Sequence, residues 1–193
     1  ISRGLIRRGE LRAMVEEGCL GVTSNPTIFD KAISGSADYD EEIRGILRRA
    51  PDVDAGEIIT SLMISDIGMA CDVLRPVYDR TQGHDGFVSI EVTPSKARNT
   101  AATIAEVREL WKRTGKPNLM VKIPATKEGI PAIRQAIAAG INVNVTLIFG
   151  LERYGAVMDA YIAGLEDRIA KNEPINMIAS VASFFVSRVD TKI

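Results

Sequence analysis

The sequence predicts an α/β fold of the (β/α)8-barrel class, in which strands and helices alternate around a parallel sheet. Strand-like and helix-like segments follow one another along the chain with short connections, which is typical of a parallel sheet. The glycine patterns GxGxxG and GxxxxGK[ST], which mark nucleotide-binding open sheets, are absent. Several strands also carry polar residues on one face, and a barrel can use such a face to line its interior. An open doubly wound sheet is the alternative, and the missing glycine patterns favour the barrel.

Composition is that of an ordinary globular protein and points away from two classes of partner. The 193 residues are enough for one sizeable domain, and 46% are hydrophobic and 25% charged. The net charge of -1 gives no field that would attract nucleic acid or an anionic membrane surface. Aromatic residues make up 5% and are scattered, which argues against a base-stacking platform. No apolar run reaches the roughly 18 residues that a membrane helix needs. We therefore expect no nucleic-acid partner and no membrane partner.

Cysteine and histidine are scarce. The two cysteines, Cys19 and Cys71, form no CxxC pair, and His84 is the single histidine. This argues against a Cys/His zinc cluster. His84 lies in the turn-like stretch 82–86, where a solvated loop histidine is expected. The low cysteine content suits a reducing cytosol, so a cytoplasmic location is predicted.

The expected elements alternate along nearly the whole chain. Asp54 is expected to cap a long helix with Glu57 as the second half of a capping box, and Pro76 should kink that helix or end it early. The helix after the fourth strand repeats apolar residues at Leu151, Tyr154, Met158, Tyr161, Leu165 and Ile169. The expected strands cover residues 20–25, 86–92, 118–123, 141–149 and 177–185. The expected helices cover residues 38–49, 54–78, about 100–114, 127–139 and 151–171.

Period-two alternation separates an apolar and a polar face on most of these strands. In the strand at 141–149, one face carries Val143, Val145 and Leu147, and the other carries Asn142, Asn144 and Thr146. Two further strands place Ser89, Glu91 and Thr93 together and Gly21, Thr23 and Asn25 together. Parallel strands covered on both faces are usually almost wholly apolar. A sheet with one solvated face is the alternative, but helices separate these strands, so the pattern favours a polar pocket at the mouth of a barrel.

Lys122 is the residue that most sharply suggests chemistry. It lies between Val121 and Ile123 in a short apolar strand and should be well buried. Burial of an unpaired lysine lowers its pKa, and a neutral amine attacks ketones, so buried lysines serve as Schiff-base formers. The alternative is a lysine that pairs with a buried carboxylate for structural reasons. Glu91 on the preceding strand could be that carboxylate, and the two interpretations share the same geometry.

Other polar residues on these strands suit a sugar-phosphate substrate. Schiff-base aldol chemistry needs a proton shuttle, which Glu91 and Thr146 could supply with a water molecule. A bound polyol needs hydrogen-bond partners, and the polar candidates are Asn25, Asn144 and Ser183. Arg188 follows the last expected strand, where it could bind a phosphate. The alternative for Arg188 is an ordinary surface ion pair with Asp190.

Five segments in order carry a resemblance to a known family. They are residues 21–29 (GVTSNPTIF), 89–94 (SIEVTP), 118–126 (NLMVKIPAT), 140–149 (GINVNVTLIF) and 182–190 (ASFFVSRVD). Each is a weak signal alone, but each falls on a separate expected strand and together they span nearly the whole chain. On these residues the sequence resembles the transaldolase family.

The resemblance implies a class I aldolase barrel that needs no metal and no cofactor. It implies transfer of a dihydroxyacetone unit from sedoheptulose 7-phosphate or fructose 6-phosphate to an aldose phosphate, in the pentose phosphate pathway. The expected partners are these sugar phosphates and a second copy of the chain in a homodimer. By position, the implied roles are Schiff-base formation for Lys122, a water-mediated proton shuttle for Glu91 and Thr146, binding of the dihydroxyacetone hydroxyls for Asn25, Asn144 and Ser183, a pocket wall for Phe185, phosphate binding for Arg188 and a supporting role for Thr23.

The sequence departs from the family pattern at both ends. The family has an acid–base aspartate a few residues before the segment that matches residues 2–6, and it continues through two more strands, the first with another phosphate-binding arginine. We therefore expect residues 1–193 to form an incomplete barrel catalytic domain that covers roughly strands two to six of a longer protein. The alternatives are a fructose 6-phosphate aldolase, a barrel fused to an isomerase domain, and a non-catalytic sugar-phosphate-binding fragment.

Overall fold

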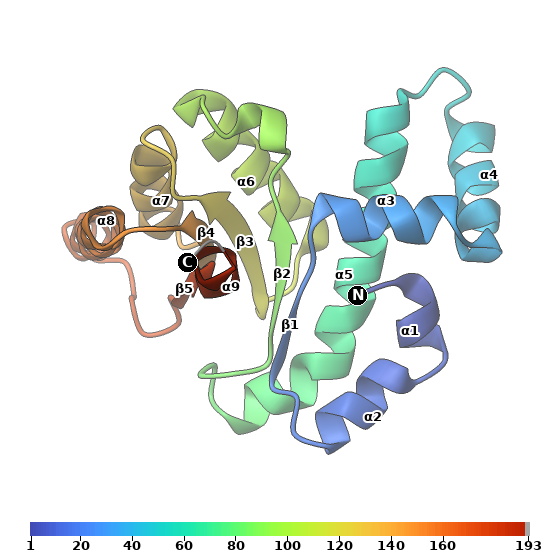
Figure 1. Ribbon diagram of the computed structural model, residues 1–193, viewed down its shortest axis with the longest axis horizontal. Coiled ribbons are helices and arrows are strands. Elements are labelled where there is room, and N and C mark those ends of the chain that lie inside the picture. The colour runs from blue at the N-terminus through green and yellow to red at the C-terminus, as the bar shows by residue number, and fades with distance from the viewer. Residues whose placement is uncertain (192–193) are drawn as a thin grey trace. The chain divides into compact units, whose positions relative to one another are not determined.

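A computed structural model describes residues 1–191 of the chain, in two compact units (Figure 1). The first unit contains Ile1–Ile90 and Arg113–Leu119. The second contains Glu91–Lys112 and the described part of Met120–Ile193. The boundary passes through two strands, and each unit is described by itself below.

The first unit is mainly helical, with two parallel strands. Its strands are β1 (Gly21–Thr23) and β2 (Phe87–Glu91, whose last residue lies in the second unit), which pair in the register Gly21 to Phe87 and Thr23 to Ser89. Ser24 extends this pairing, because its backbone N–H and its hydroxyl both donate to the Ser89 carbonyl, at 3.2 and 2.8 Å. The helices of the unit are α1 (Arg3–Arg7), α2 (Glu10–Glu16), α3 (Pro26–Ser34), the 3-10 turn η1 (Ala37–Tyr39), α4 (Asp40–Arg49) and α5 (Ala55–Arg80).

The second unit alternates strands and helices. Its elements are η2 (Pro94–Lys96), α6 (Thr100–Thr114, whose last two residues lie in the first unit), β3 (Leu119–Pro124), α7 (Gly129–Ala138), β4 (Val143–Ile148), α8 (Leu151–Ile169), β5 (Ser180–Phe184) and α9 (Val186–Asp190). β3 pairs in parallel with β4, and β4 with β5. The described strands follow the order β1-β2-β3-β4-β5, so each neighbours the next in the sequence. Parallel strands in sequence order with intervening helices confirm the predicted (β/α)-barrel class.

Strand β3, which lies in the second unit except for Leu119, is buried at every residue. Leu119, Val121 and Ile123 are fully inaccessible to solvent, and Met120 is 2% exposed. Such a strand is covered on both faces, as parallel strands between helices are. Any polar group within it must therefore find its partners inside the protein.

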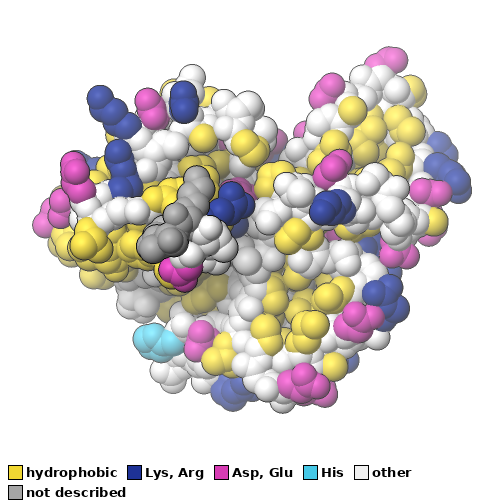
Figure 2. Space-filling view, viewed as in Figure 1, with side chains coloured by type: hydrophobic (Ala, Val, Ile, Leu, Met, Phe, Trp, Pro, Cys, Tyr) yellow, Lys and Arg dark blue, Asp and Glu magenta, His cyan; other side chains and the backbone are white. Residues whose placement is uncertain are grey.

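Helix α8 packs through small residues rather than through the apolar repeat expected from the sequence. Its buried positions are Val157, Ala160, Gly164 and Arg168. A Cβ on Gly164 would lie 2.7 Å from the Cβ of Ile137 on α7, so only glycine allows this approach of the two helices. The expected repeat is wrong as a buried face, because three of its members are exposed: Leu151, Met158 and Ile169. Figure 2 shows hydrophobic side chains gathered on the surface over α8.

Helix α5 begins as predicted but ends later. The Asp54 side chain accepts a hydrogen bond from the Gly56 N–H at 2.8 Å, which confirms the N-cap. The Glu57 half of the capping box is wrong, because its carboxylate binds Arg113 instead, at 2.6 Å. An early end at Pro76 is also wrong, since the helix continues to Arg80. The turn after the proline buries Val77 and Tyr78, and this packing offsets the lost backbone hydrogen bond.

Four short helices have no counterpart among the expected elements: α1, α2, α3 and α9. Each spans five to nine residues, too few for a periodic apolar stripe to stand out. Contacts with residues distant in the sequence hold α1. In α1, Arg3 is fully buried, and its Nε donates to Asp66 of α5 at 2.7 Å. The Tyr39 hydroxyl donates to the other oxygen of Asp66 at 2.7 Å, and burial raises the pKa of Tyr39 to about 12, so this hydroxyl keeps its proton.

We predict that Asp66→Ala lowers the free energy of unfolding by about 3 kcal/mol, because it leaves the Arg3 guanidinium buried without its fully buried carboxylate partner. Glu10→Ala is the matched control, since it breaks the Arg8–Glu10 ion pair between side chains that are 64% and 47% exposed. It should cost less than about 1 kcal/mol. Urea titrations of the two variants make the comparison. Equal losses would contradict a role for Asp66 as the anchor of α1.

Candidate active site

Lys122 is buried at the centre of β3 and faces a carboxylate. Its residue exposure is 7%, which confirms the predicted burial. The Nζ atom lies 3.1 Å from Oε2 of Glu91, and the two side chains are only 9% and 13% exposed. A charge-assisted hydrogen bond in such a site is strong, because little water competes for either group. The arrangement fits both interpretations that the sequence left open, a structural pair and a lysine with a neighbouring proton carrier.

The backbone fixes the two partners relative to each other. The N–H of Val92, immediately after Glu91, donates to the carbonyl oxygen of Lys122 at 3.2 Å. Helix α7 begins very close to the end of β3. A Cβ on Gly129 would collide with the carbonyl oxygen of Pro124, so only glycine allows this approach. The strand end that carries Lys122 is therefore held between a neighbouring strand and the helix that follows it.

Three predicted site residues lie on the strands beside Lys122. In the β3–β4 register Lys122 is opposite Asn144, and Pro124 is opposite Thr146. Asn144 and Thr146 are 6% and 1% exposed. The Ser183 hydroxyl on β5 donates to Oδ1 of Asn144 at 2.9 Å. The structure thus brings Lys122, Asn144, Thr146 and Ser183 to adjacent strands of the second unit, together with Glu91.

One part of the predicted alternation on β4 is wrong. Leu147 was expected on the buried apolar face with Val143 and Val145, but it is 40% exposed, whereas Ile148 is fully buried. Leu147 has a φ of 61°, and the register with β5 shifts between Val145 and Ile148. A bulge of this kind inserts one residue into the period-two pattern, so the side chains beyond it change faces.

Phe185 and Arg188 follow β5 and contact each other. The Arg188 guanidinium carbon lies 5.7 Å from the centre of the Phe185 ring, within range of a cation–π contact. The Phe185 ring is also 5.7 Å from the ring of Phe149. Arg188 is exposed and, within residues 1–191, forms no ion pair with Asp190. The surface ion pair considered for Arg188 is therefore not what the structure shows.

Thr23 and Asn25 lie in the first unit, at the end of β1. Asn25 is the N-cap of α3, and its Oδ1 accepts a hydrogen bond from the Ile28 N–H at 2.9 Å. Thr23 is exposed, and its hydroxyl donates to the Ser24 carbonyl at 3.4 Å. Proximity of these two residues to Lys122 stays a prediction.

Glu106, a buried carboxylate on α6, was not predicted from the sequence. It is 8% exposed, and it binds the backbone N–H and the hydroxyl of Thr93, two residues after Glu91. The spacing of residues along α6 could have indicated that Glu106 is buried, because the buried positions of this helix recur every three or four residues. These positions are Thr103, Ile104, Glu106, Val107, Leu110 and Thr114.

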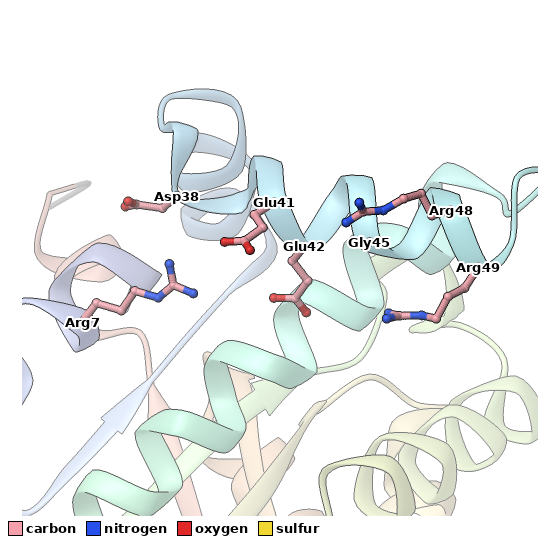
Figure 3. Close-up of a pocket in the computed structure, with 7 residues that line it drawn as sticks. All are labelled: Arg7, Asp38, Glu41, Glu42, Gly45, Arg48 and Arg49. Atoms are coloured by element: carbon pink, nitrogen blue, oxygen red, sulfur yellow. The ribbon is translucent and has the colours of Figure 1, made fainter.

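A separate pocket of about 300 Å³ in the first unit contains none of the predicted site residues (Figure 3). Its ionic side chains come from α1, η1 and α4 and are of both signs: Arg7, Asp38, Glu41, Glu42, Arg48 and Arg49. Glu42 also forms an ion pair with the buried Arg3 at 2.7 Å. These charges largely compensate one another, so the pocket presents no single sign to a ligand.

Residues 1–191 contain neither a cluster of metal ligands nor a helix suited to a membrane. No group of three or more His, Cys, Asp or Glu side chains in this range is placed to hold a metal ion. No helix in the same range combines the length and the apolar character needed to cross a membrane.

The site is thus a lysine–carboxylate pair on adjacent parallel strands, with an Asn–Ser pair beside it, as in a lysine-dependent barrel aldolase. The chain belongs to the transaldolase/fructose-6-phosphate aldolase family, whose sequence model matches residues 1–193. It is 53% identical over 194 residues to a transaldolase of Parafrankia sp. (strain EAN1pec) and to one of Saccharopolyspora erythraea, in each case covering all of this chain and 52% of the relative. It is 50% identical to a transaldolase of Trichodesmium erythraeum, again covering the whole chain and 50% of the relative. The chain spans about half the length of the curated relatives it matches.

We predict that Asn25 acts on stability through its cap. Asn25→Ala should lower the free energy of unfolding by about 1 kcal/mol, because α3 loses an acceptor for the Ile28 N–H. Asn25→Asp keeps a side-chain acceptor and should stay within about 0.5 kcal/mol of the parent. Chemical denaturation of the three proteins tests this. A destabilised Asp variant would show that the cap is not the main contribution of Asn25.

Proposed function

We propose that the protein containing this chain is a transaldolase, which moves a dihydroxyacetone unit between sugar phosphates through a Schiff base on Lys122. The observation that carries the proposal is the buried Lys122 ammonium group 3.1 Å from the Glu91 carboxylate. Family membership and relatives named transaldolase support it. A lysine on a strand of a parallel barrel is well placed to meet a substrate at the carboxyl ends of the strands.

In the proposed reaction, the Lys122 amine attacks the ketone carbon of a ketose phosphate, and a water molecule leaves as the C=N bond forms. The bond between C3 and C4 of the sugar then breaks. Its electron pair moves into the enamine on Lys122, and an aldose phosphate departs after its hydroxyl loses a proton. The enamine next attacks the aldehyde of an acceptor aldose phosphate, and water hydrolyses the imine to release the new ketose and the free lysine.

Glu91 is the proposed proton carrier for these steps. The carboxylate can accept a proton from the Lys122 ammonium group, which frees the amine, and can return it to the oxygen that leaves as water. Thr146, buried on β4 beyond Asn144, is proposed to help hold the water through which the proton moves. The direct contact of Glu91 and Lys122 supports this assignment.

The remaining residues are proposed to bind the sugar phosphate. Asn144 and Ser183, which are hydrogen-bonded to each other, would bind the dihydroxyacetone hydroxyls together with Asn25. Phe185 would form a wall of the pocket, and Arg188, which is exposed and charged, would bind the phosphate. Thr23 would support Asn25.

Four statements about the whole protein belong to the same proposal. Its barrel would have eight strands, of which β1 to β5 correspond to strands two to six. It would act in the pentose phosphate pathway, in the cytoplasm, and as a homodimer. The five strands in sequence order and the length of the relatives support the barrel assignment. The pathway, the cytoplasmic location and the homodimer are inferred from membership of the family.

We predict that incubation of the full-length protein with fructose 6-phosphate, followed by borohydride, leaves a dihydroxyacetone-sized adduct on Lys122. Peptide mass spectrometry locates the adduct. Lys122→Met should abolish it, because it removes the amine that lies 3.1 Å from Glu91. Lys127→Met is the matched control, since Lys127 is an exposed lysine five residues further on, and labelling of Lys122 should persist. A folded protein that binds the sugar but shows no labelled lysine would overturn the Schiff-base mechanism.

The family description also names fructose-6-phosphate aldolase, which is the second candidate. Both enzymes would give the Lys122 adduct. They differ in the fate of the enamine, because an aldolase protonates it and releases dihydroxyacetone, whereas a transaldolase passes it to an acceptor. Turnover of fructose 6-phosphate should rise strongly when erythrose 4-phosphate is added. Equal release of dihydroxyacetone with and without this acceptor would favour the aldolase.

We predict that Glu91→Gln lowers turnover about 10²- to 10⁴-fold, because the amide keeps the shape of the side chain but cannot carry the proton. The control is Asp167→Asn, which neutralises a carboxylate paired with the half-exposed Arg134 and should leave turnover unchanged. Steady-state kinetics with saturating sugar phosphates give the comparison. Activity of Glu91→Gln at the parent level would make the Lys122–Glu91 pair a structural one.

A further inference from the structure

We propose that Glu106 is a positioning residue that holds Glu91 in place for the reaction on Lys122. The inference rests on the proposed function and extends it to a residue on α6, outside the strands. It starts from a carboxylate that is buried although it does not contact Lys122 or Glu91 directly.

Both oxygens of Glu106 bind Thr93. Oε2 accepts the Thr93 backbone N–H at 3.0 Å, and Oε1 accepts the Thr93 hydroxyl at 2.5 Å. The side chain of Glu106 is 10% exposed, so the carboxylate has lost most of its water. Burial of a carboxylate costs free energy unless hydrogen-bond donors compensate it, and a bidentate contact of this kind restricts the bound residue in both position and rotation.

Thr93 lies two residues after Glu91, and the backbone between them is bound on both sides. The N–H of Val92 donates to the carbonyl of Lys122, and the N–H of Thr93 donates to Glu106. The two peptide groups that follow Glu91 are therefore fixed, one by the lysine that Glu91 faces and one by Glu106. A movement at Thr93 would displace the Glu91 carboxylate from its position 3.1 Å from Lys122.

The Glu106 carboxylate also contacts the loop that follows β2. Lys96, at the end of η2, returns to within 3.5 Å of Glu106. Its carbonyl oxygen accepts the Thr103 hydroxyl of α6 at 2.8 Å. The next residue, Ala97, accepts the Thr126 hydroxyl at 2.6 Å, and Thr126 follows β3. Glu106 thus organises a loop that is also tied to the strand of Lys122.

The test compares Glu106→Ala with a variant of equal structural severity in the full-length protein. Val107→Ala is the matched control, because Val107 is the fully buried neighbour on α6 and its truncation weakens packing without touching Thr93. We expect Glu106→Ala to lower kcat about 10- to 100-fold, the size of effect that a misplacement near 1 Å causes. Borohydride should still label Lys122. Val107→Ala should lose thermal stability but keep kcat within about threefold.

Glu106→Gln guards against a failure of the alanine variant to fold. The amide keeps an acceptor for the Thr93 N–H and can donate to the hydroxyl, so it should restore kcat to within about tenfold of the parent. Two results would overturn the proposal: kcat of Glu106→Ala within threefold of the parent, or losses of kcat in Glu106→Ala, Glu106→Gln and Val107→Ala that follow their losses of stability. An unlabelled Lys122 in the parent protein would instead refute the proposed function.

Discussion

The ion pair between Lys122 and Glu91 constrains the strand ends from which its two side chains come. Lys122 lies between Val121 and Ile123, which are fully buried. An ammonium group at such a position costs free energy unless a carboxylate compensates its charge. The carboxylate comes from the preceding strand, so the pair requires β2 and β3 to keep one register near their carboxyl ends. The hydrogen bond from Val92 to the Lys122 carbonyl enforces that register. The proposed chemistry and the strand alignment therefore depend on the same few atoms.

Other buried polar side chains of the second unit also have hydrogen-bond partners. Asn144 accepts the Ser183 hydroxyl, and Glu106 accepts two donors from Thr93. Each contact joins an element to its neighbour in the sheet or in the following helix, so a change in one strand is transmitted to the next by geometry. Preorganised polar groups of this kind hold catalytic side chains within the narrow limits that a reaction requires. The cost of burying them is offset by the fully apolar positions of β3.

Sequence patterns predicted the parts of this arrangement that depend on local rules. The strands and long helices came from periodicity, and Lys122 stood out because a charge interrupts an apolar strand. The alternation predicted the wrong face for Leu147, because a positive φ at this residue shifts the pattern. Leucine rarely adopts the left-handed region, so its presence gives no indication of this backbone conformation. Arg3 and Glu106 were missed for a different reason. Their burial depends on Asp66 and Thr93, partners that no periodicity links to them.

The amide of Asn25 suits both the helix cap that the structure shows and the substrate contact that we propose. Its Oδ1 caps α3, which explains an acceptor at this position but not the choice of an amide, because asparagine and aspartate cap helices about equally well. An aspartate would add a negative charge, unfavourable for an anionic sugar phosphate nearby. The amide also retains N–H donors that a carboxylate lacks, and a polyol can accept them. The cap and the proposed contact with the substrate use different atoms of the same side chain, so the observed cap is compatible with the role that the sequence predicts.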